Sequence, residues 1–352
     1  MESPLVIPVF IPHSGCPHQC AFCNQAILTS QKHCLPDAEE IYKIIDQYLG
    51  YKAHRSRVEL AFFGGNFLGL PDPEIVRLLE LIAPYIENQT IHGIRCSTRP
   101  DTITEQRLDL IAPFGVCLVE LGVQSMNDAV LKKANRGHTR QDTYRAIELL
   151  KAQNFQVGVQ VMVGLPGDSE ESLLSSTRQV AALAPDVARI YPLMVLEGSP
   201  LARWYQEGRY RPLGLDQSVY LVKEMVKILT LANVTVIRMG LQASEMMEDR
   251  SLVLAGPWHP AFGHLVLSAL VYDQVRDQVC QILGPFDRNS RTNSQTHILI
   301  GVHPRFESRL RGDKNSNLTK LRNAYPGVLF SIQTDESLVQ GAVNVRRYFS
   351  RG

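Results

Sequence analysis

The stretch Cys16-Pro17-His18-Gln19-Cys20-Ala21-Phe22-Cys23 places three cysteines close together, shortly after an apolar, β-branched run at residues 6–11. Three thiolates with the spacing C-x3-C-x2-C can hold three irons of a [4Fe-4S] cluster, whereas cluster ligation normally takes four cysteines. The fourth iron would then be open to an exchangeable ligand. The spacing therefore predicts an iron–sulfur cluster with one iron available for chemistry.

The cysteines have two alternative uses. A structural zinc site needs a fourth protein ligand, which His13, His18, His33 or Cys34 could supply. A disulfide framework is disfavoured because the chain is large, its 7 cysteines are an odd number, and we expect no secretory leader. The thiols are therefore expected to be reduced and intracellular.

The bulk composition is that of an ordinary globular protein. With 352 residues, 45% of them hydrophobic, the chain can bury the core of a large α/β barrel and a smaller appendage. The formal net charge of +1 gives no global attraction to nucleic acid or to anionic membranes. No apolar stretch approaches the roughly 20 residues of a membrane span, so the expected location is the cytoplasm, without membrane contact.

Short β-branched runs alternate with segments of helical periodicity in the first part of the chain. Strands are predicted at residues 6–11, 58–63, 91–96, 116–123, 155–163 and 187–191. Helices are predicted at residues 37–49, 72–86, 128–134, 141–152 and 169–183. The alternation indicates right-handed βαβ units and a parallel sheet. The predicted fold is α/β, a partial (β/α)6 TIM-type barrel over residues 1–195 with its reactive loops at the carboxyl ends of the strands.

The remaining residues, 196–352, are predicted to form a smaller C-terminal α/β extension that packs on the barrel and contributes to substrate binding. Helices are expected at residues 218–231 and 262–283, a polar bend at 287–294 and a strand at 296–301. The oligomeric state is left open.

Polar or glycine-rich clusters follow several of the predicted strands. Gly64, Gly65 and Asn66 follow the second strand, where glycines let the backbone approach a ligand. Ser97 opens the cluster Ser97-Thr98-Arg99-Pro100-Asp101 after the third strand, which could bind ribose hydroxyls or substrate. Ordinary turns, with Asp101 capping the next helix, are the alternative.

Three further positions are candidates for cofactor binding. Gln124 alternates with Glu120 out of an apolar run, and Glu120 needs a partner because a lone carboxylate in a buried parallel strand is costly. Arg136, in the basic run 136–140, could bind a carboxylate through its guanidinium fork, unless that run is a solvated turn. Gly164 opens a tight turn, Gly164-Leu165-Pro166-Gly167, that could lie along an adenine ring.

Several motifs, taken in order, resemble the radical S-adenosylmethionine (SAM) domain of the Elongator catalytic subunit and its bacterial relatives. The matching stretches are the cysteine loop, Phe63-Gly64-Gly65, Thr98-Arg99-Pro100-Asp101, Glu120-Leu121-Gly122-Val123-Gln124-Ser125, Arg136-Gly137-His138-Thr139, Gly164-Leu165-Pro166-Gly167, Ile190-Tyr191-Pro192-Leu193 and Gly208-Arg209-Tyr210. The resemblance implies a partial barrel, a [4Fe-4S] cluster on Cys16, Cys20 and Cys23, and reductive cleavage of SAM to a 5′-deoxyadenosyl radical.

The resemblance also implies roles for single residues. Phe22 would pack near the adenine, Gly64 and Gly65 would hold the amino group of SAM, and Arg136 would hold its carboxylate. An external one-electron reductant of the flavodoxin or ferredoxin type would supply the electron.

Departures from the Elongator pattern limit the function that can be inferred. The eukaryotic and archaeal subunits have a longer gap between the first two cysteines and end in an acetyltransferase-like domain. Here only about 140 residues follow Tyr210, where the matching stretches end, and we find no glycine-rich pantetheine loop among them. The chain therefore resembles the shorter, stand-alone bacterial members, and acetyl-CoA-dependent carboxymethylation of tRNA is in doubt.

We expect modification of tRNA or another RNA-linked substrate. One alternative is a haem- or porphyrin-related radical SAM protein, similar to the oxygen-independent coproporphyrinogen oxidases. Another is a non-catalytic iron–sulfur or RNA-binding module. A basic stretch between Arg305 and Arg322 could follow a phosphate backbone or form a solvated helix face. Cys34, Cys96, Cys117 and Cys280 have no assigned role.

Overall fold

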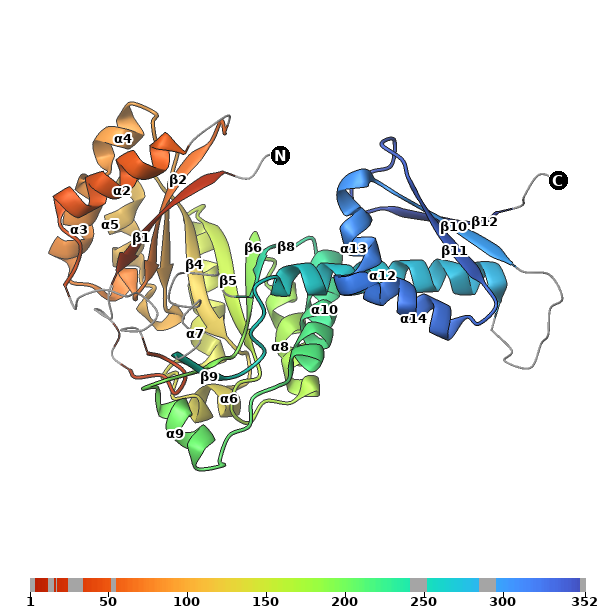
Figure 1. The fold of residues 1–352 in the computed structure, drawn as a ribbon. Helices are drawn as coiled ribbons and strands as arrows, with labels where there is room; N and C mark the ends of the chain where they lie inside the picture. The colour runs from red at the N-terminus through yellow and green to blue at the C-terminus, as the bar shows by residue number, and fades with distance from the viewer. Residues whose placement is uncertain are drawn as a thin grey trace. The chain divides into compact units, whose positions relative to one another are not determined.

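The computed structural model describes residues 4–11, 16, 18–24, 34–51, 55–240, 252–284 and 296–348 (Figure 1). Contacts within the chain divide it into two compact units, Met1–Trp258 and His259–Gly352. The boundary predicted after residue 195 lies inside the first unit, at the short strand β7 (Val195–Leu196).

The first unit contains a seven-stranded sheet in the order β1-β2-β3-β4-β5-β6-β8. Every neighbouring pair in it is parallel, and Figure 1 shows the strands following one another across the sheet. The strands are β1 (Leu5–Ile11), β2 (Val58–Gly64), β3 (Ile94–Thr98), β4 (Val116–Gln124), β5 (Gln156–Val163), β6 (Val187–Pro192) and β8 (Thr235–Met239). The predicted α/β partial-barrel fold is confirmed, and β8 is a seventh strand that the sequence pattern did not indicate.

Helices connect the strands, as right-handed crossovers require. They are α2 (Ala38–Gly50), α3 (Asp72–Glu80), α4 (Ala83–Glu87), α5 (Glu105–Ile111), α6 (Asp128–Lys133), α7 (Arg140–Ala152), α8 (Glu170–Ala182), α9 (Pro200–Gln206) and α10 (Leu215–Leu231). The single helix predicted at residues 72–86 is in fact α3 and α4. Pro84 lacks an N–H group and its ring would clash with a preceding carbonyl inside a continuous helix, so a break before it is favoured.

Helix starts agree with the capping residues in the sequence. Asp37 caps α2 and forms a capping box with Glu40, and Ser169 accepts a hydrogen bond from the Ser172 N–H at the start of α8. These side chains satisfy N–H groups that have no partner within the helix. Short polar residues before the apolar pattern therefore fix where these helices begin.

The second unit is a three-stranded sheet with helices. Strand β10 (His297–Val302) lies between β11 (Leu329–Thr334), to which it is parallel, and β12 (Val343–Tyr348), to which it is antiparallel. Its helices are α12 (Phe262–Leu283), α13 (Glu307–Arg311) and α14 (Ser316–Ala324). The helix predicted at 262–283 is confirmed, the strand predicted at 296–301 is found one residue later, and the polar bend at 287–294 lies outside the described residues.

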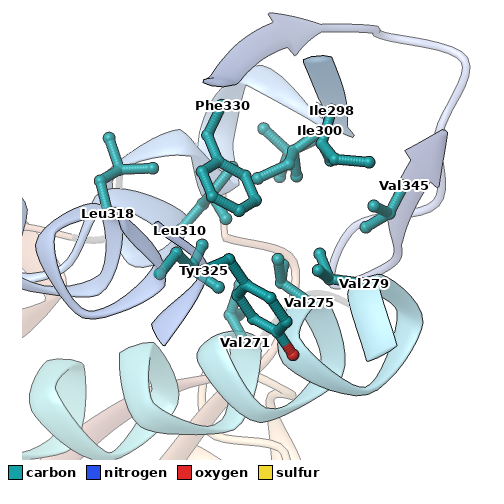
Figure 2. Packing of buried hydrophobic residues seen from close by; sticks show 12 residues of the cluster. Val271, Val275, Val279, Ile298, Ile300, Leu310, Leu318, Tyr325, Phe330 and Val345 are labelled. Atoms are coloured by element: carbon teal, nitrogen blue, oxygen red, sulfur yellow. The ribbon is translucent and has the colours of Figure 1, made fainter. Parts of the chain in front are cut away.

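A hydrophobic core holds this second unit together. Figure 2 shows Ile298, Ile300, Phe330 and Val345 of the sheet pointing toward Val275 and its neighbours on α12. Leu310 of α13 and Leu318 of α14 complete the cluster. Because one face of the sheet supplies these residues, strand alternation sends the neighbouring residues to the opposite face.

Strands β1 to β6 and β8 run in the same direction, so their carboxyl ends lie at one edge of the sheet. The cysteine loop, the Gly64-Gly65 pair, the Thr98-to-Asp101 cluster, Gln124 and Gly164 all follow or end these strands. The fold therefore gathers the predicted motifs along one rim. No helix in the described ranges is long and apolar enough to cross a membrane.

Truncating a buried side chain in the second core should destabilise that unit. Val275 is fully buried, whereas Val339 is 77% exposed. We expect Val275→Ala to lower the free energy of unfolding of this unit by about 2 kcal/mol, because the change leaves a cavity. The matched control Val339→Ala should stay within about 0.5 kcal/mol of wild type. Urea denaturation measures both, and equal effects would contradict the core assignment.

Candidate active site

The loop that carries the three predicted cluster ligands is anchored at several points. Its Ala21 N–H donates to the Ala134 carbonyl over 2.9 Å, and its Ala21 carbonyl accepts from Leu201 over 2.7 Å. The side chain of Asn135 donates to the Gln19 carbonyl over 2.6 Å. The end of α6 and the start of α9 therefore hold this loop against the barrel.

The cysteines differ in exposure. Cys20 is buried, and Cys16 and Cys23 are half-buried. Burial raises the pKa of Cys16 above its ordinary value, although the positive charges of Arg136 and Arg99 oppose that shift. Among the residues described, no three Cys, His, Asp or Glu side chains are grouped so that they could hold a metal ion. Ligation of a cluster by Cys16, Cys20 and Cys23 therefore stays a prediction.

The alternative zinc ligands are placed only in part. His13 and His33 lie outside the described residues, and Cys34 is exposed. The ring of His18 packs against Gly137, where a Cβ atom would lie 2.2 Å from the His18 Cδ2. Gly137 also has a φ of 81°, in the left-handed region, so both its space and its backbone favour glycine.

Arg136 connects this loop to the barrel rim. Its Nη1 donates to the Cys20 Sγ over 3.4 Å, and its Nη2 donates to the Gly122 carbonyl over 2.7 Å. The Nε is buried and has no hydrogen-bond partner within the described part of the chain. The predicted carboxylate-binding arginine is therefore already in contact with a predicted cluster ligand and retains one donor for a bound group.

The Gly122 carbonyl reaches Arg136 from an irregular part of β4. Leu121 and Gln124 of β4 pair with Val159 and Val161 of β5, so β4 has one more residue than β5 between these pairs and carries a bulge. Gln124 at its end has a φ of 68°, which is uncommon for a residue other than glycine. Its Oε1 accepts from Gln160 over 3.4 Å. The predicted cofactor contact of Gln124 is not tested by these interactions.

Arg99 is buried and forms a second arginine centre. Its Nε and Nη2 donate to the two carboxylate oxygens of Asp101 over 2.9 Å each, and Nη2 also donates to the Arg136 carbonyl over 2.7 Å. Burial disfavours the charge of Asp101, but the hydrogen bonds and charge of Arg99 outweigh it, so the pKa of Asp101 lies below its ordinary value. The Nη1 of Arg99 is buried without a partner among the described residues.

Asn66 joins the ends of β2 and β3. Its Oδ1 accepts from the Thr98 hydroxyl over 2.7 Å, from the Arg99 N–H over 3.0 Å and from the Thr102 hydroxyl over 3.1 Å. Before it, Gly64 has a φ of 96°, a conformation that glycine adopts at little cost. Asn66 therefore links the ends of the two strands. The cofactor contacts expected of Gly64, Gly65 and Asn66 stay predictions.

The other candidates lie along the same rim. Ser97 of β3 pairs in register with Glu120 of β4. The carbonyl of Gly164 accepts from the Tyr210 hydroxyl over 2.7 Å. Phe22 packs against a buried cluster that includes Val130 and Leu165. These positions agree with a ligand at the rim but do not themselves show one.

Two interacting residues were missed by the sequence interpretation. Arg189 of β6 pairs with Glu120, donating from Nη2 over 3.0 Å, and its guanidinium lies 4.9 Å from the centre of the Phe63 ring. It supplies the partner that a buried Glu120 requires. Tyr210, whose pKa is raised by burial, holds the Gly164 turn. The charged Arg189 within a predicted parallel strand was the signal that could have revealed the pair.

The donor set fits an iron–sulfur cluster with an anionic ligand beside it. Three thiols on one loop suit iron, and the unpartnered nitrogens of Arg136 and Arg99 suit a carboxylate. These residue types would suit a cluster and a small molecule with a carboxylate, and their arrangement around the two stays a prediction.

Comparison with known proteins agrees with this interpretation. Residues 10–180 match the family described as the Radical SAM superfamily, and residues 185–271 match the Radical_SAM C-terminal domain. An uncharacterised protein of Methanocaldococcus jannaschii is 30% identical over 230 residues, which cover 61% of this chain and 69% of that protein.

A tRNA uridine(34) acetyltransferase of Dehalococcoides mccartyi is 32% identical over 231 residues, covering 56% of this chain. The match covers only 50% of that enzyme, so this chain corresponds to about half its length. The solved structure of Elp3 from the archaeon Methanocaldococcus infernus matches with a TM-score of 0.61 at 22% identity, covering 79% of this chain and 64% of that one. This last similarity concerns the fold.

His138 should make folding stability depend on pH. Its Nε2 lies 3.2 Å from the Val123 carbonyl, and burial, followed by the charges of Arg136 and Arg99, lowers its pKa to about 3. An unfolded histidine titrates near about 6.5. The unfolded chain therefore binds a proton that the folded chain does not, and the stabilising contribution present above about pH 6.5 is lost as the pH falls toward about 3.

We expect His138→Gln to flatten this dependence by up to about 1.4 kcal/mol per pH unit below about pH 6. Urea denaturation of wild type and variant at several pH values measures the difference. Parallel pH profiles for the two proteins would show that His138 is protonated in the folded state.

Proposed function

Because the chain belongs to the radical SAM superfamily, we propose that it is an enzyme that acts on tRNA or another RNA-linked substrate. Members of this superfamily use a [4Fe-4S] cluster and SAM. When bound, the two together supply the difficult chemistry, the reductive cleavage of SAM to a 5′-deoxyadenosyl radical. The observation that carries the proposal is the contact between Arg136 and Cys20 at the rim where the other motifs meet.

Each residue of this rim has a part in the proposed reaction. Cys16, Cys20 and Cys23 would hold the cluster, and Arg136, which donates to the Cys20 sulfur, would have its buried Nε available for the SAM carboxylate. Arg99 and Asp101 fix the Arg136 backbone. A flavodoxin- or ferredoxin-type protein delivers the electron. The burial of Cys20, Arg99 and Arg136 would help to exclude water from a reactive radical.

The choice of an RNA substrate is supported by the tRNA uridine(34) acetyltransferase relative. The similarity covers about half of that enzyme, and we propose for this chain a radical step on RNA. Incubating the reduced protein with SAM and either unmodified tRNA or a porphyrin tests the choice. A new modified nucleoside is expected, whereas conversion of the porphyrin alone would overturn the RNA assignment.

Loss of one predicted ligand should abolish SAM cleavage. Cys20→Ala removes a buried thiol from the loop, whereas Cys280→Ala removes an exposed thiol from α12. We expect 5′-deoxyadenosine formation to fall to background in the first variant and to stay at the wild-type level in the second. Anaerobic reconstitution with iron and sulfide, followed by measurement of iron and 5′-deoxyadenosine, provides the test. Native activity of Cys20→Ala would refute the assignment.

The Arg136 contact should also set the reduction potential of the cluster. A positive charge and an N–H···S hydrogen bond both stabilise the reduced, more negative state. Arg136→Gln should therefore shift the midpoint to a more negative potential, as measured by a redox titration followed by electron paramagnetic resonance. Arg140→Gln, which changes an exposed arginine paired with Asp128, is the control and should leave the midpoint unchanged. An unshifted midpoint in Arg136→Gln would contradict the contact.

A further inference from the structure

The sheet of the second unit has one face against the helices and one face toward solvent. Ile298, Ile300 and Val345 point into the core shared with α12, and Figure 1 shows α12 and α14 on the same side of this sheet. On the other face, Tyr348 and Leu329 are each 47% exposed. No described helix of this unit therefore covers that face, which we call the outer face of β10, β11 and β12.

The outer face presents aromatic groups together with hydrogen-bonding groups. His297 lies in register between Leu329 and Tyr348, and its ring centre lies 4.8 Å from that of Tyr348. The Nε2 of His297 lies 2.7 Å from the Ser331 hydroxyl, which fixes the ring. The planes of the two rings are inclined at 64°, so the rings meet edge to face, and Tyr348 is the exposed one of the two.

Arg346 adds a cation to the same face. It lies next to Leu299 in register, and its Nη2 reaches across β10 to the Gln333 Oε1 over 3.1 Å. Gly301, which pairs with Gln333, has no side chain, and Leu338 from the connection after β11 lies over it, with its Cδ1 3.5 Å from the position that a Cβ atom would take. The remaining Arg346 donors and the Gln333 amide lie within reach of a ligand that stacks on Tyr348.

The charge distribution favours an anionic ligand. Residues 259–352 contain twelve Lys and Arg against seven Asp and Glu, whereas residues 1–258 contain 24 against 28. The outward positions of the three described strands include no carboxylate, and Asp335 and Glu336 follow the end of β11. The net charge of the whole chain is near zero because the excess of Asp and Glu in residues 1–258 balances the excess of Lys and Arg in residues 259–352.

Stacking rings, amides and a cation on an open sheet are the groups by which proteins bind single-stranded RNA. A second copy of the chain would need a more apolar surface, whereas the aliphatic side chains of the outer face, Leu299, Leu329 and the adjoining Leu338, lie among polar residues of the three strands. We propose that the outer face of β10, β11 and β12 binds a single-stranded segment of RNA. A base stacks on Tyr348, whose ring His297 supports edge-on, and Arg346 contacts the phosphate backbone. The inference rests on the proposed function, since this segment belongs to the RNA substrate.

Fluorescence anisotropy with a short, labelled oligouridylate and the full-length protein tests the site without SAM or reductant. Tyr348→Ala should weaken binding roughly tenfold, because one stacked base contributes about 1–3 kcal/mol, while Tyr348→Phe should keep the wild-type affinity. Arg346→Gln should weaken binding and lower the slope of log affinity against log salt by about 0.7. The control Arg322→Gln changes the same charge on α14 and should leave the affinity near that of wild type.

The possible results separate this inference from the proposed function. Absence of binding, or equal affinity in wild type and Tyr348→Ala, would overturn the RNA site even where 5′-deoxyadenosine is formed. Analytical ultracentrifugation could instead reveal a dimer that dissociates in the Tyr348→Ala variant. That result would assign the outer face to a second copy of the chain and would also overturn the RNA site. Conversely, the protein could bind the oligouridylate in a way that Tyr348→Ala weakens and yet never cleave SAM. That result would support the RNA site and refute the enzymatic proposal. Circular dichroism checks that each variant is folded.

Discussion

The buried guanidinium of Arg99 is the interaction on which the rim of the barrel depends. It binds Asp101 at the end of its own strand and the backbone of Arg136, which lies after α6 and far along the chain. Arg136 in turn contacts Cys20 and the bulge of β4. A buried cation needs such partners, because an unpaired charge in this environment costs several kcal/mol. The same bonds that satisfy Arg99 therefore align the loops that approach the predicted cluster.

Much of this arrangement could be predicted from the sequence because its signals are local. Alternating β-branched and helical patterns gave six of the seven parallel strands, and capping residues such as Asp37 and Ser169 gave the helix starts. Parallel strands have all their carboxyl ends at one edge, so finding each motif after a strand was enough to place the motifs together. The three cysteines belong to the same local pattern.

The remaining features depend on contacts that no local pattern records. Strand β8 is half-exposed at the edge of the sheet, so its residues lack the continuous apolar run of a buried parallel strand. The pairing of Glu120 with Arg189 joins residues of β4 and β6, and the contact of Arg136 with Cys20 joins α6 to the loop after β1. The sequence pattern could not indicate which face of the second sheet is exposed. That depends on which face packs against α12 and α14.

The bulge in β4 has a consequence for how this chain can vary. One extra residue between Leu121 and Gln124 changes which side of the strand every later residue faces, because side chains alternate with a period of two. Deleting a single residue there would restore a regular ladder, withdraw the Gly122 carbonyl from Arg136 and turn Gln124 toward the opposite face. A substitution that keeps the length leaves the ladder in place, but at Gly122 a Cβ atom would lie 2.6 Å from the Arg136 Nη2. At this point on the rim, both the number of residues and the absence of a side chain at Gly122 constrain divergence.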